Sequence, residues 1–352
     1  MTTSIPKPKV RHPGLQKNAI GLTRRDYEGT VSTLCAGCGH DSITAAIIRS
    51  FWELSIPPHT VGKLSGIGCS SKTPAYFLKE AHGFNAVHGR MPSIAAGASA
   101  ANRALTLLGV SGDGDSLSIG LGQFCHAIRR NVRVVYILEN NGVYGLTKGQ
   151  FSASADVGSK AKRGEPNRNP PIDPVLLALT LGATFVARSF SGDKEQLVPI
   201  IKAALSHRGF AFIDVVSPCV TFNDHEGSTK SYRFTREHAK EVVQADLVPL
   251  RAEITASYAE GATTDVRMHD GSVVRLRKVA PDYDPTDRDQ AYTYIRERQQ
   301  SGETPTGLLY LSPDTTDMHE IEKTVDAPLM SLSHEELCPG SAALDSLMEE
   351  FK

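Results

Sequence analysis

The strongest constraint on the fold is an alternation of apolar runs and helical stretches in the middle of the chain. In order, these are the apolar run 104–110, a Gly/Asp loop at 111–115, a helical stretch at 117–129 and the apolar run 132–138. This strand–loop–helix–strand order is typical of a parallel sheet covered by helices. A second alternation of the same kind spans 175–216. The sequence therefore predicts an α/β fold.

We expect three parts in the chain: an N-terminal arm at 1–30, an α/β domain at 31–240 and a C-terminal extension at 241–352. The arm contains Pro and Lys residues without clear periodicity. In the extension, 266–278 alternates around a turn-type His-Asp-Gly-Ser sequence, which predicts a β-hairpin. A charged helix is predicted next, followed by an acidic tail. We expect the extension to form an added layer or an interface arm.

The bulk composition weighs against two classes of function. The 352 residues carry 38 Lys and Arg against 39 Asp and Glu, so no basic field points to a nucleic acid or an anionic membrane. No apolar run approaches the roughly 18 residues of a membrane-spanning helix, and the first residues lack the apolar middle of a signal peptide. We therefore expect a cytoplasmic protein that binds neither a nucleic acid nor a membrane.

Two loops at the predicted sheet edge carry the groups that a diphosphate and a divalent ion require. They are Gly112-Asp113-Gly114-Asp115 after the first apolar run, and Asn141 to Val143 after the next. A carboxylate from Asp113, an amide oxygen from Asn141 and the carbonyl of Val143 are hard ligands that suit Mg²⁺. Gly112 and Gly114 let phosphate oxygens approach the main chain, at the positive end of the following helix.

Each loop alone has a simpler interpretation. Gly-Asp-Gly can be a tight turn after a strand, and Asn-Gly an ordinary reverse turn. However, Asp113 and Asn141 lie 28 positions apart, which suits one helix and one strand that return the chain to the same edge. A nicotinamide-binding G-x-G-x-x-G motif fits less well, because Leu117 occupies the place of its third glycine. The combination favours a diphosphate and metal site.

Six cysteines suggest metal or redox chemistry, because a cytoplasmic compartment keeps thiols reduced. Cys35 and Cys38 form a C-x-x-C pair, and Cys69 and Cys219 lie in two further loops. Four thiolates suit tetrahedral zinc or an iron–sulfur cluster, and a C-x-x-C pair also serves thiol redox work. The residues alone leave these alternatives open. The other two cysteines are Cys125, which we expect on a helix and buried in the core, and Cys338, which we expect in the tail.

The order of the motifs resembles a known family. The Gly112-Asp113-Gly114 loop with the later Asn-Asn pair is similar to the thiamine diphosphate motif, in which the Asp, the second Asn and a carbonyl hold Mg²⁺. These positions correspond to Asp113, Asn141 and Val143. Four further runs resemble, in the same order, the β subunit of 2-oxoacid:ferredoxin oxidoreductases: L-C-A-G-C-G-H at 34–40, G-I-G-C-S at 66–70, H-G-R at 88–90 and Y-G-L-T-K-G-Q at 144–150. The resemblance covers about 30–235 and implies the thiamine-diphosphate-binding fold of that family.

The resemblance also implies roles for individual residues. One [4Fe–4S] cluster would be ligated by Cys35, Cys38, Cys69 and Cys219. The implied contacts to thiamine diphosphate come from Ile67, Gly68, Ser70, His88, Gly112, Gly114, Asp115, Asn141, Gly145 and Leu146. His88 and Arg90 would act beside the thiamine, and the ammonium group of Lys148 would pair with the substrate carboxylate. Without the resemblance, these three are ordinary loop and surface residues.

Two loops near the implied substrate site have distinctive sequences. The run Gln150-Phe151-Ser152-Ala153-Ser154 departs from the Ser-Pro-Thr pattern that many relatives have after the Gln. The stretch 160–168 is basic. A charge run is usually solvated surface, but this one could also bind the phosphates of coenzyme A or an acidic ferredoxin.

The implied activity is the CoA-dependent oxidative decarboxylation of a 2-oxoacid, with electrons passed to ferredoxin. An α subunit, alone or fused to a γ domain, would supply the carboxylate that activates the thiamine, in a heterodimer or an (αβ)₂ assembly. The runs 221–228 and 283–288 resemble the 2-oxoglutarate branch, whereas pyruvate and branched-chain 2-oxoacids are alternatives. Two rival classes are a cluster-free thiamine diphosphate decarboxylase or synthase subunit, and a non-catalytic electron carrier or zinc protein.

Overall fold

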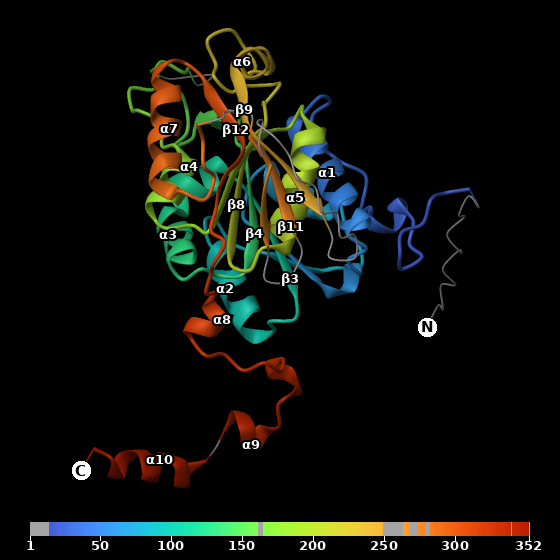
Figure 1. Cartoon of the computed structure of the whole chain (residues 1–352), viewed down its shortest axis with the longest axis vertical. Coiled ribbons are helices and arrows are strands. Elements are labelled where there is room, and N and C mark those ends of the chain that lie inside the picture. The colour runs from blue at the N-terminus through green and yellow to red at the C-terminus, as the bar shows by residue number, and fades with distance from the viewer. Residues whose placement is uncertain are drawn as a thin grey trace.

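A ten-stranded sheet forms the centre of the protein in the computed structural model (Figure 1). The structure describes residues 14–160, 165–248, 263–267, 273–278, 282–338 and 340–351. The strands are β1 (Val61–Ser65), β2 (His82–Asn85), β3 (Thr106–Gly112), β4 (Val134–Asn140), β7 (Phe185–Phe190), β8 (Phe210–Val216), β9 (Ala239–Val248), β10 (Thr263–Arg267), β11 (Val273–Lys278) and β12 (Thr304–Leu311). A separate hairpin pairs β5 (Val143–Tyr144) with β6 (Gln150–Phe151).

The predicted α/β class with a parallel sheet is confirmed. The strands β7, β8, β4, β3, β1 and β2 are neighbours in that order, and each pair is parallel. Every residue of β4, β7 and β8 is buried, as expected for parallel strands that are covered on both faces. Nothing in the sequence pattern had indicated β1 or β2, which are short.

Helices cover both faces of the sheet (Figure 1). The longer ones are α1 (Gly39–Glu53), α2 (Met91–Ala101), α3 (Leu121–Arg129), α4 (Pro174–Thr180), α5 (Lys194–Ser206), α6 (Tyr232–His238), α7 (Arg288–Gln300) and α10 (Ser341–Glu349), and the short ones are α8 (Met318–Ile321) and α9 (His334–Leu337). The helices α1 and α5 pack together, as do α2 with α3 and α4 with α7. The predicted helix at 117–129 begins instead as a π-helix, Gly114–Ile119, and continues as α3.

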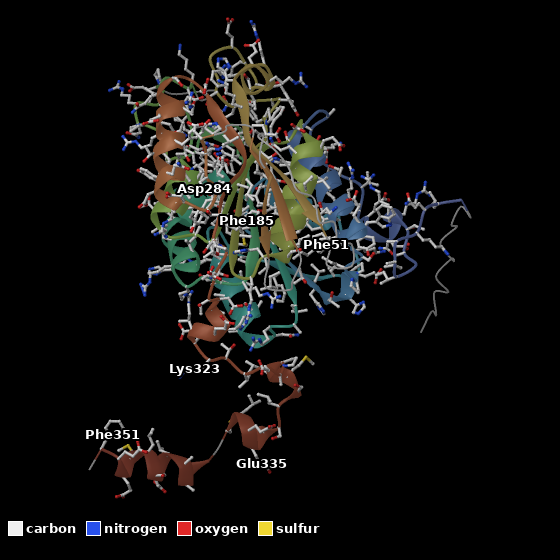
Figure 2. All side chains as sticks on the ribbon, in the orientation of Figure 1. Phe51, Phe185, Asp284, Lys323, Glu335 and Phe351 are labelled. Carbon is white, nitrogen blue, oxygen red and sulfur yellow. The ribbon has the colours of Figure 1, made fainter. Side chains whose placement is uncertain are left out.

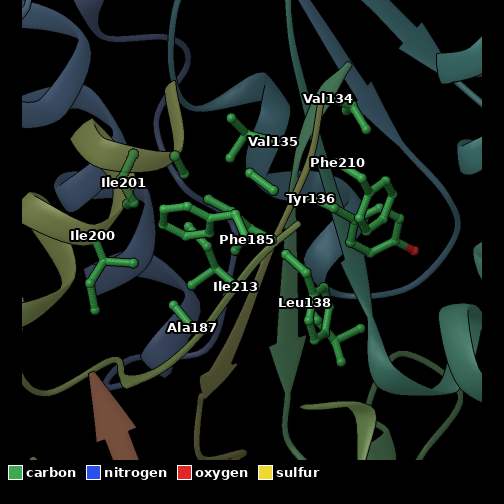
Figure 3. Packing of buried hydrophobic residues seen from close by; sticks show 14 of the residues in the cluster. Val134, Val135, Tyr136, Leu138, Phe185, Ala187, Ile200, Ile201, Phe210 and Ile213 are labelled. Carbon is green, nitrogen blue, oxygen red and sulfur yellow. The ribbon is translucent and has the colours of Figure 1, made fainter. Parts of the chain in front are cut away.

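The core fills the space on both sides of β4 and β8. Tyr136 and Phe210 face one side (Figure 3). On this side, the ring of Phe124 on α3 lies 5.2 Å from that of Tyr136. Phe185 of β7 lies on the other side with Ile200 and Ile201 of α5. Side chains that alternate between the faces of a strand produce these two packed layers.

The C-terminal extension continues the main sheet and does not form an added layer. The predicted hairpin is present as β10 and β11, which pair antiparallel, and β11 pairs with β9. The turn between them lies outside the described residues. The strand β12 joins β9 to β7 and therefore connects the extension to the parallel strands. The predicted boundary at residue 240 falls within β9, so the division into 31–240 and 241–352 stays a prediction.

The two ends of the chain differ in how they contact this body. In the predicted arm, Tyr27 is fully buried, and the amide of Asn18 donates to its hydroxyl oxygen at 2.8 Å. The helices α9 and α10 extend away from the body, where Glu335 and Phe351 lie (Figure 2). No helix in the described part of the chain is long and apolar enough to span a bilayer.

A buried lysine on β1 makes stability depend on pH. The ammonium group of Lys63 donates to the carbonyls of Phe77 and Leu78 at 2.7 and 3.0 Å, and only 9% of the residue is exposed. Burial lowers the pKa of Lys63 from 10.5 to about 8. Between these values the unfolded chain binds more protons than the folded chain, so raising the pH favours folding.

We therefore expect the protein to gain stability relative to a Lys63→Met variant as the pH rises from 8 to 10.5. Urea unfolding of both proteins across this range measures the difference, in which the titration of all other groups cancels. Parallel stability curves would show that Lys63 titrates at its ordinary pKa in the folded state.

Candidate functional site

The candidate site lies where parallel strands end. Gly112, the last residue of β3, pairs with Glu139 near the end of β4, so the loops after these strands are adjacent. Together with the loop after β1, they line one pocket. Its lining includes these predicted residues: Ile67, Gly68, Cys69, Ser70, His88, Gly112, Asp113, Gly114, Asp115, Asn141, Val143, Gly145 and Leu146. The residues His40, Tyr144 and Thr147 line it as well, and no role had been predicted for them.

Asp113 is a buried carboxylate at the base of this pocket, with only 1% of its surface exposed. Its oxygens accept from the backbone N–H of Gly142 at 3.0 Å and from the hydroxyls of Ser152 and Ser154, the latter at 2.6 Å. Burial raises the pKa of Asp113, while the two serine hydroxyls act to lower it. Both serines belong to the run that departs from the family pattern.

Asn141 lies beside Asp113, and its position is fixed on three sides. Its side-chain oxygen accepts from the N–H of Val143 at 3.0 Å, and its carbonyl accepts from the amide of Asn223 at 2.8 Å. Its side-chain nitrogen lies 3.5 Å from Nε2 of His40. The predicted pairing of Asp113 with Asn141 at one edge of the sheet is therefore present in the structure.

Glycines in and beside the pocket pack directly against other side chains. A Cβ on Gly114 would lie 2.5 Å from the ring of Tyr144, and one on Gly112 would lie 2.8 Å from the hydroxyl oxygen of Ser70. On Gly66 it would lie 1.7 Å from the carboxylate of Asp115. Real Cβ atoms do not approach other atoms this closely, so a side chain at any of these positions would force Tyr144, Ser70 or Asp115 to move. Gly112 and Gly114 also line the pocket, so their main chain forms part of the wall that a diphosphate requires.

Asp115 has a structural role in this arrangement. Its Oδ1 accepts from the N–H of Gly89 at 2.8 Å, and its Oδ2 accepts from the hydroxyl of Ser111 at 2.8 Å. This carboxylate therefore holds the loop that contains His88 against the end of β3. The predicted contact between Asp115 and the cofactor stays a prediction.

Four cysteine thiols converge next to this pocket. A Cβ on Gly145 would lie 3.4 Å from the sulfur of Cys69 and 3.6 Å from that of Cys219, although the two cysteines come from loops 150 positions apart. Burial, with a smaller contribution from the proximity of Cys219, raises the pKa of Cys38 to about 12. Cys35 likewise raises the pKa of Cys219, after the larger effect of burial. The four predicted cluster ligands are thus close enough to interact electrostatically.

These thiols do not form a preorganised site for a single ion. Among the residues that the structure describes, no three His, Cys, Asp or Glu side chains form a group that could hold a metal ion. The remaining cysteines lie elsewhere, with Cys125 partly buried in α3 and Cys338 exposed at the end of α9.

A buried pair between the pocket and the thiols was not predicted. Glu139 is fully buried, neither of its side-chain oxygens has a hydrogen-bond partner among the residues that the structure describes, and Oε2 lies 3.4 Å from Nδ1 of His40. Burial lowers the pKa of His40 to about 4 and raises that of Glu139 well above its usual range. Burial therefore disfavours the charged form of both groups. The one feature of the sequence that could have indicated this pair is Glu139 itself, a glutamate near the end of an otherwise apolar strand.

The three predicted catalytic residues are exposed at the rim. His88 lines the pocket, whereas Arg90 and Lys148 do not. Lys148 has a positive φ of 84°, a conformation that is uncommon for residues other than glycine, in the turn between β5 and β6. In the basic loop, Lys160 and Arg168 are exposed, and 161–164 lie outside the described residues.

Comparisons with known proteins identify the domain. Residues 65–215 match the family model described as thiamine pyrophosphate enzyme, C-terminal TPP binding domain. The β subunit of 2-oxoacid:ferredoxin oxidoreductase from Saccharolobus solfataricus is 46% identical over 56% of this chain and 65% of that protein. The 2-oxoglutarate oxidoreductase subunit KorB of Mycobacterium tuberculosis is 41% identical over 66% of this chain and 62% of that protein.

Two further matches extend this similarity. The 2-oxoglutarate synthase subunit KorB of Methanocaldococcus jannaschii is 36% identical over 53% of this chain and 69% of that protein. A solved structure of the 2-oxoglutarate:ferredoxin oxidoreductase from Magnetococcus marinus, with 2-oxoglutarate, coenzyme A and succinyl-CoA bound, matches with a TM-score of 0.70 and 30% identity. That match covers 88% of this chain and 91% of the other. The chain spans just under two thirds of the length of the first two relatives named. On these similarities, the chain belongs to the family of 2-oxoacid:ferredoxin oxidoreductase β subunits.

Proposed function

We propose that this chain is the β subunit of an enzyme that converts 2-oxoglutarate, coenzyme A and oxidised ferredoxin to succinyl-CoA, CO₂ and reduced ferredoxin. The observation that carries the proposal is the joint placement of the Asp113–Asn141 pair, a glycine-lined pocket and four thiols at one edge of the sheet. A cluster-free thiamine enzyme would need the first two but not the four thiols. A zinc protein or electron carrier would not need the pocket.

The residues present fit thiamine diphosphate and Mg²⁺. The Asp113 carboxylate, the Asn141 amide oxygen and the Val143 carbonyl would hold Mg²⁺, because hard oxygen ligands suit this ion. The main chain at Gly112 and Gly114 would approach the phosphate oxygens. When bound, thiamine diphosphate supplies an electron sink for the pair of electrons that loss of CO₂ releases.

The four thiols fit a [4Fe–4S] cluster. Cys35, Cys38, Cys69 and Cys219 would be its ligands, and the cluster supplies a carrier that accepts electrons singly. Burial of Cys38, Cys69 and Cys219 favours their neutral thiol form, so cluster assembly must displace those protons. Ferredoxin would be the external acceptor.

Substrate binding is assigned to the rim of the pocket. Thr147 lines the pocket, and Lys148 follows it in the sequence. The ammonium group of Lys148 would pair with a substrate carboxylate. His88 and Arg90 would lie beside the thiamine, and Lys160 with Arg168 would meet coenzyme A phosphates or ferredoxin. The relatives named for 2-oxoglutarate support that substrate over pyruvate or branched-chain 2-oxoacids.

The catalytic carboxylate that activates thiamine is assigned to a partner. The names of the relatives as β subunits support an α subunit, alone or fused to a γ domain, in a heterodimer or an (αβ)₂ assembly. We further propose that the enzyme acts in the cytoplasm.

The substrate assignment is tested on the anaerobically purified complex, co-expressed with its α subunit. Ferredoxin reduction with coenzyme A is measured with 2-oxoglutarate, pyruvate and a branched-chain 2-oxoacid. We expect the highest kcat/KM with 2-oxoglutarate. A higher kcat/KM with pyruvate or the branched-chain 2-oxoacid would contradict 2-oxoglutarate as the preferred substrate. It would not contradict the proposed class of enzyme.

The metal assignment is tested with Asp113→Ala. Because it removes a charged ligand, we expect this variant to bind Mg²⁺ and thiamine diphosphate at least about tenfold more weakly, measured by calorimetry on the complex stripped of cofactor. Asp314→Ala, which removes an exposed carboxylate, is the matched control. If the two variants bind the cofactor equally well, Asp113 is not a metal ligand.

The cluster assignment is tested with Cys219→Ser. We expect this variant to lose most of its iron, since a hydroxyl is a poor replacement for a thiolate ligand. Cys125→Ser is the control, because this thiol lies in α3, away from the group. Iron and sulfide are determined on both anaerobically purified complexes. An unchanged iron content in Cys219→Ser would favour the cluster-free alternative.

A further inference from the structure

A continuous series of hydrogen-bonded polar side chains, most of them buried, runs from Asp113 to the C-terminal extension. It begins at the hydroxyl of Ser154, which lies 2.6 Å from Oδ2 of Asp113 and 2.8 Å from Oδ1 of Asn140. The side-chain nitrogen of Asn140 donates to Oδ1 of Asp214 at 3.0 Å. Ser154, Asn140 and Asp214 are each at most 2% exposed. This first half of the chain connects the pocket to β8.

The second half crosses the sheet and reaches α7. Nε of Arg188 donates to Oδ2 of Asp214 at 2.8 Å, and Nη2 donates to both oxygens of Asp173 at 2.8 and 2.9 Å. Asp173 caps the N-terminus of α4 and also accepts from the side-chain amide of Gln299, near the end of α7. Residues from 113 to 299 are thereby linked through side chains.

The polarity of this chain is fixed by its charged groups. Asp214 is a carboxylate and accepts only, so the amide of Asn140 must direct its nitrogen to Asp214 and its oxygen to Ser154. The single hydroxyl proton of Ser154 is therefore shared between two acceptors, Asn140 and Asp113. Arg188 is only 4% exposed, and its attraction and hydrogen bonds lower the pKa of Asp173 in spite of burial. Asp173 is thereby favoured in its charged form.

The same side chains line a cavity of about 550 Å³, to whose wall Asn140, Ser154, Asp173, Arg188, Asp214 and Gln299 all contribute. A cavity leaves the side chains beside it without close packing, so the hydrogen bonds hold them in place. Asp113 is joined to these side chains by the hydrogen bond from Ser154.

We infer that the C-terminal extension positions Asp113 for the cofactor through this chain, with Gln299 and Arg188 as positioning residues. The inference rests on the proposed function, because it takes Asp113 to be the Mg²⁺ ligand. This inference assigns a role to the extension. Gln299 on α7 makes the last hydrogen bond of the series, to Asp173, and the position of the Asp113 carboxylate depends on that contact.

The test uses Gln299→Ala in the co-expressed complex. Asp173 keeps Arg188 and its two backbone donors in this variant, so the fold is retained. We expect the Kd for Mg²⁺ with thiamine diphosphate to rise by roughly 2- to 30-fold, the range of coupling along such networks. The thermal midpoint of the cofactor-free complex should match that of the control. Gln290→Ala is that control, because Gln290 lies on the same helix, is exposed and is outside the chain.

A double variant separates coupling from a general loosening of the structure. Ser154→Ala breaks the chain at its other end by removing one hydroxyl. If the chain transmits the effect, Gln299→Ala adds little once Ser154 is gone, so the double variant weakens binding by less than the product of the single effects. Independent effects that multiply would overturn the inference, as would equal Kd values for Gln299→Ala and Gln290→Ala.

The two proposals fail in different ways. If Asp113→Ala leaves cofactor binding unchanged, the proposed function is wrong at this site and the inference fails with it. If Asp113→Ala weakens binding while Gln299→Ala behaves like Gln290→Ala, only the positioning role is wrong.

Discussion

The fold depends on parallel strands that are buried on both faces. Because β1, β3, β4 and β8 run in the same direction, the loops that follow them meet at one edge of the sheet. The apolar layers at α3 and α5 fix the spacing of these strands, and therefore of the loops. The polar groups of the site are thus positioned by the burial of apolar side chains, which supplies most of the free energy of folding.

The site tolerates buried charge because each charged group has several partners. Asp113 accepts hydrogen bonds from donors in two loops, and Arg188 lies between two carboxylates. Removal of one partner from a buried ion pair leaves a charge without compensation, which costs about 3 to 5 kcal/mol. Glu139 differs, because it has no hydrogen-bond partner within the described part of the chain and burial favours its neutral form.

The membership in the β-subunit family explains why one chain combines these features. In the function that we propose, a chain that held both the diphosphate end of a thiamine site and a cluster would keep the electron source and the first electron carrier on the same edge of the sheet. In the segment that joins β5 to β6, Gly145 lines the pocket together with Val143, and a Cβ on Gly145 would also contact the sulfurs of Cys69 and Cys219. The extension adds strands to the sheet and also contacts Asp173 through Gln299.

The sequence by itself determined the α/β class and the pairing of Asp113 with Asn141, because both follow from periodicity and from the distance between two neighbouring strands along the chain. It did not reveal β1 and β2, which are too short to show a period, or that the extension joins the main sheet. Only the tertiary structure placed Glu139 against His40, and Arg188 between Asp173 and Asp214. These contacts join residues from strands and helices far apart in sequence, and no local pattern encodes which of them become neighbours when the sheet assembles.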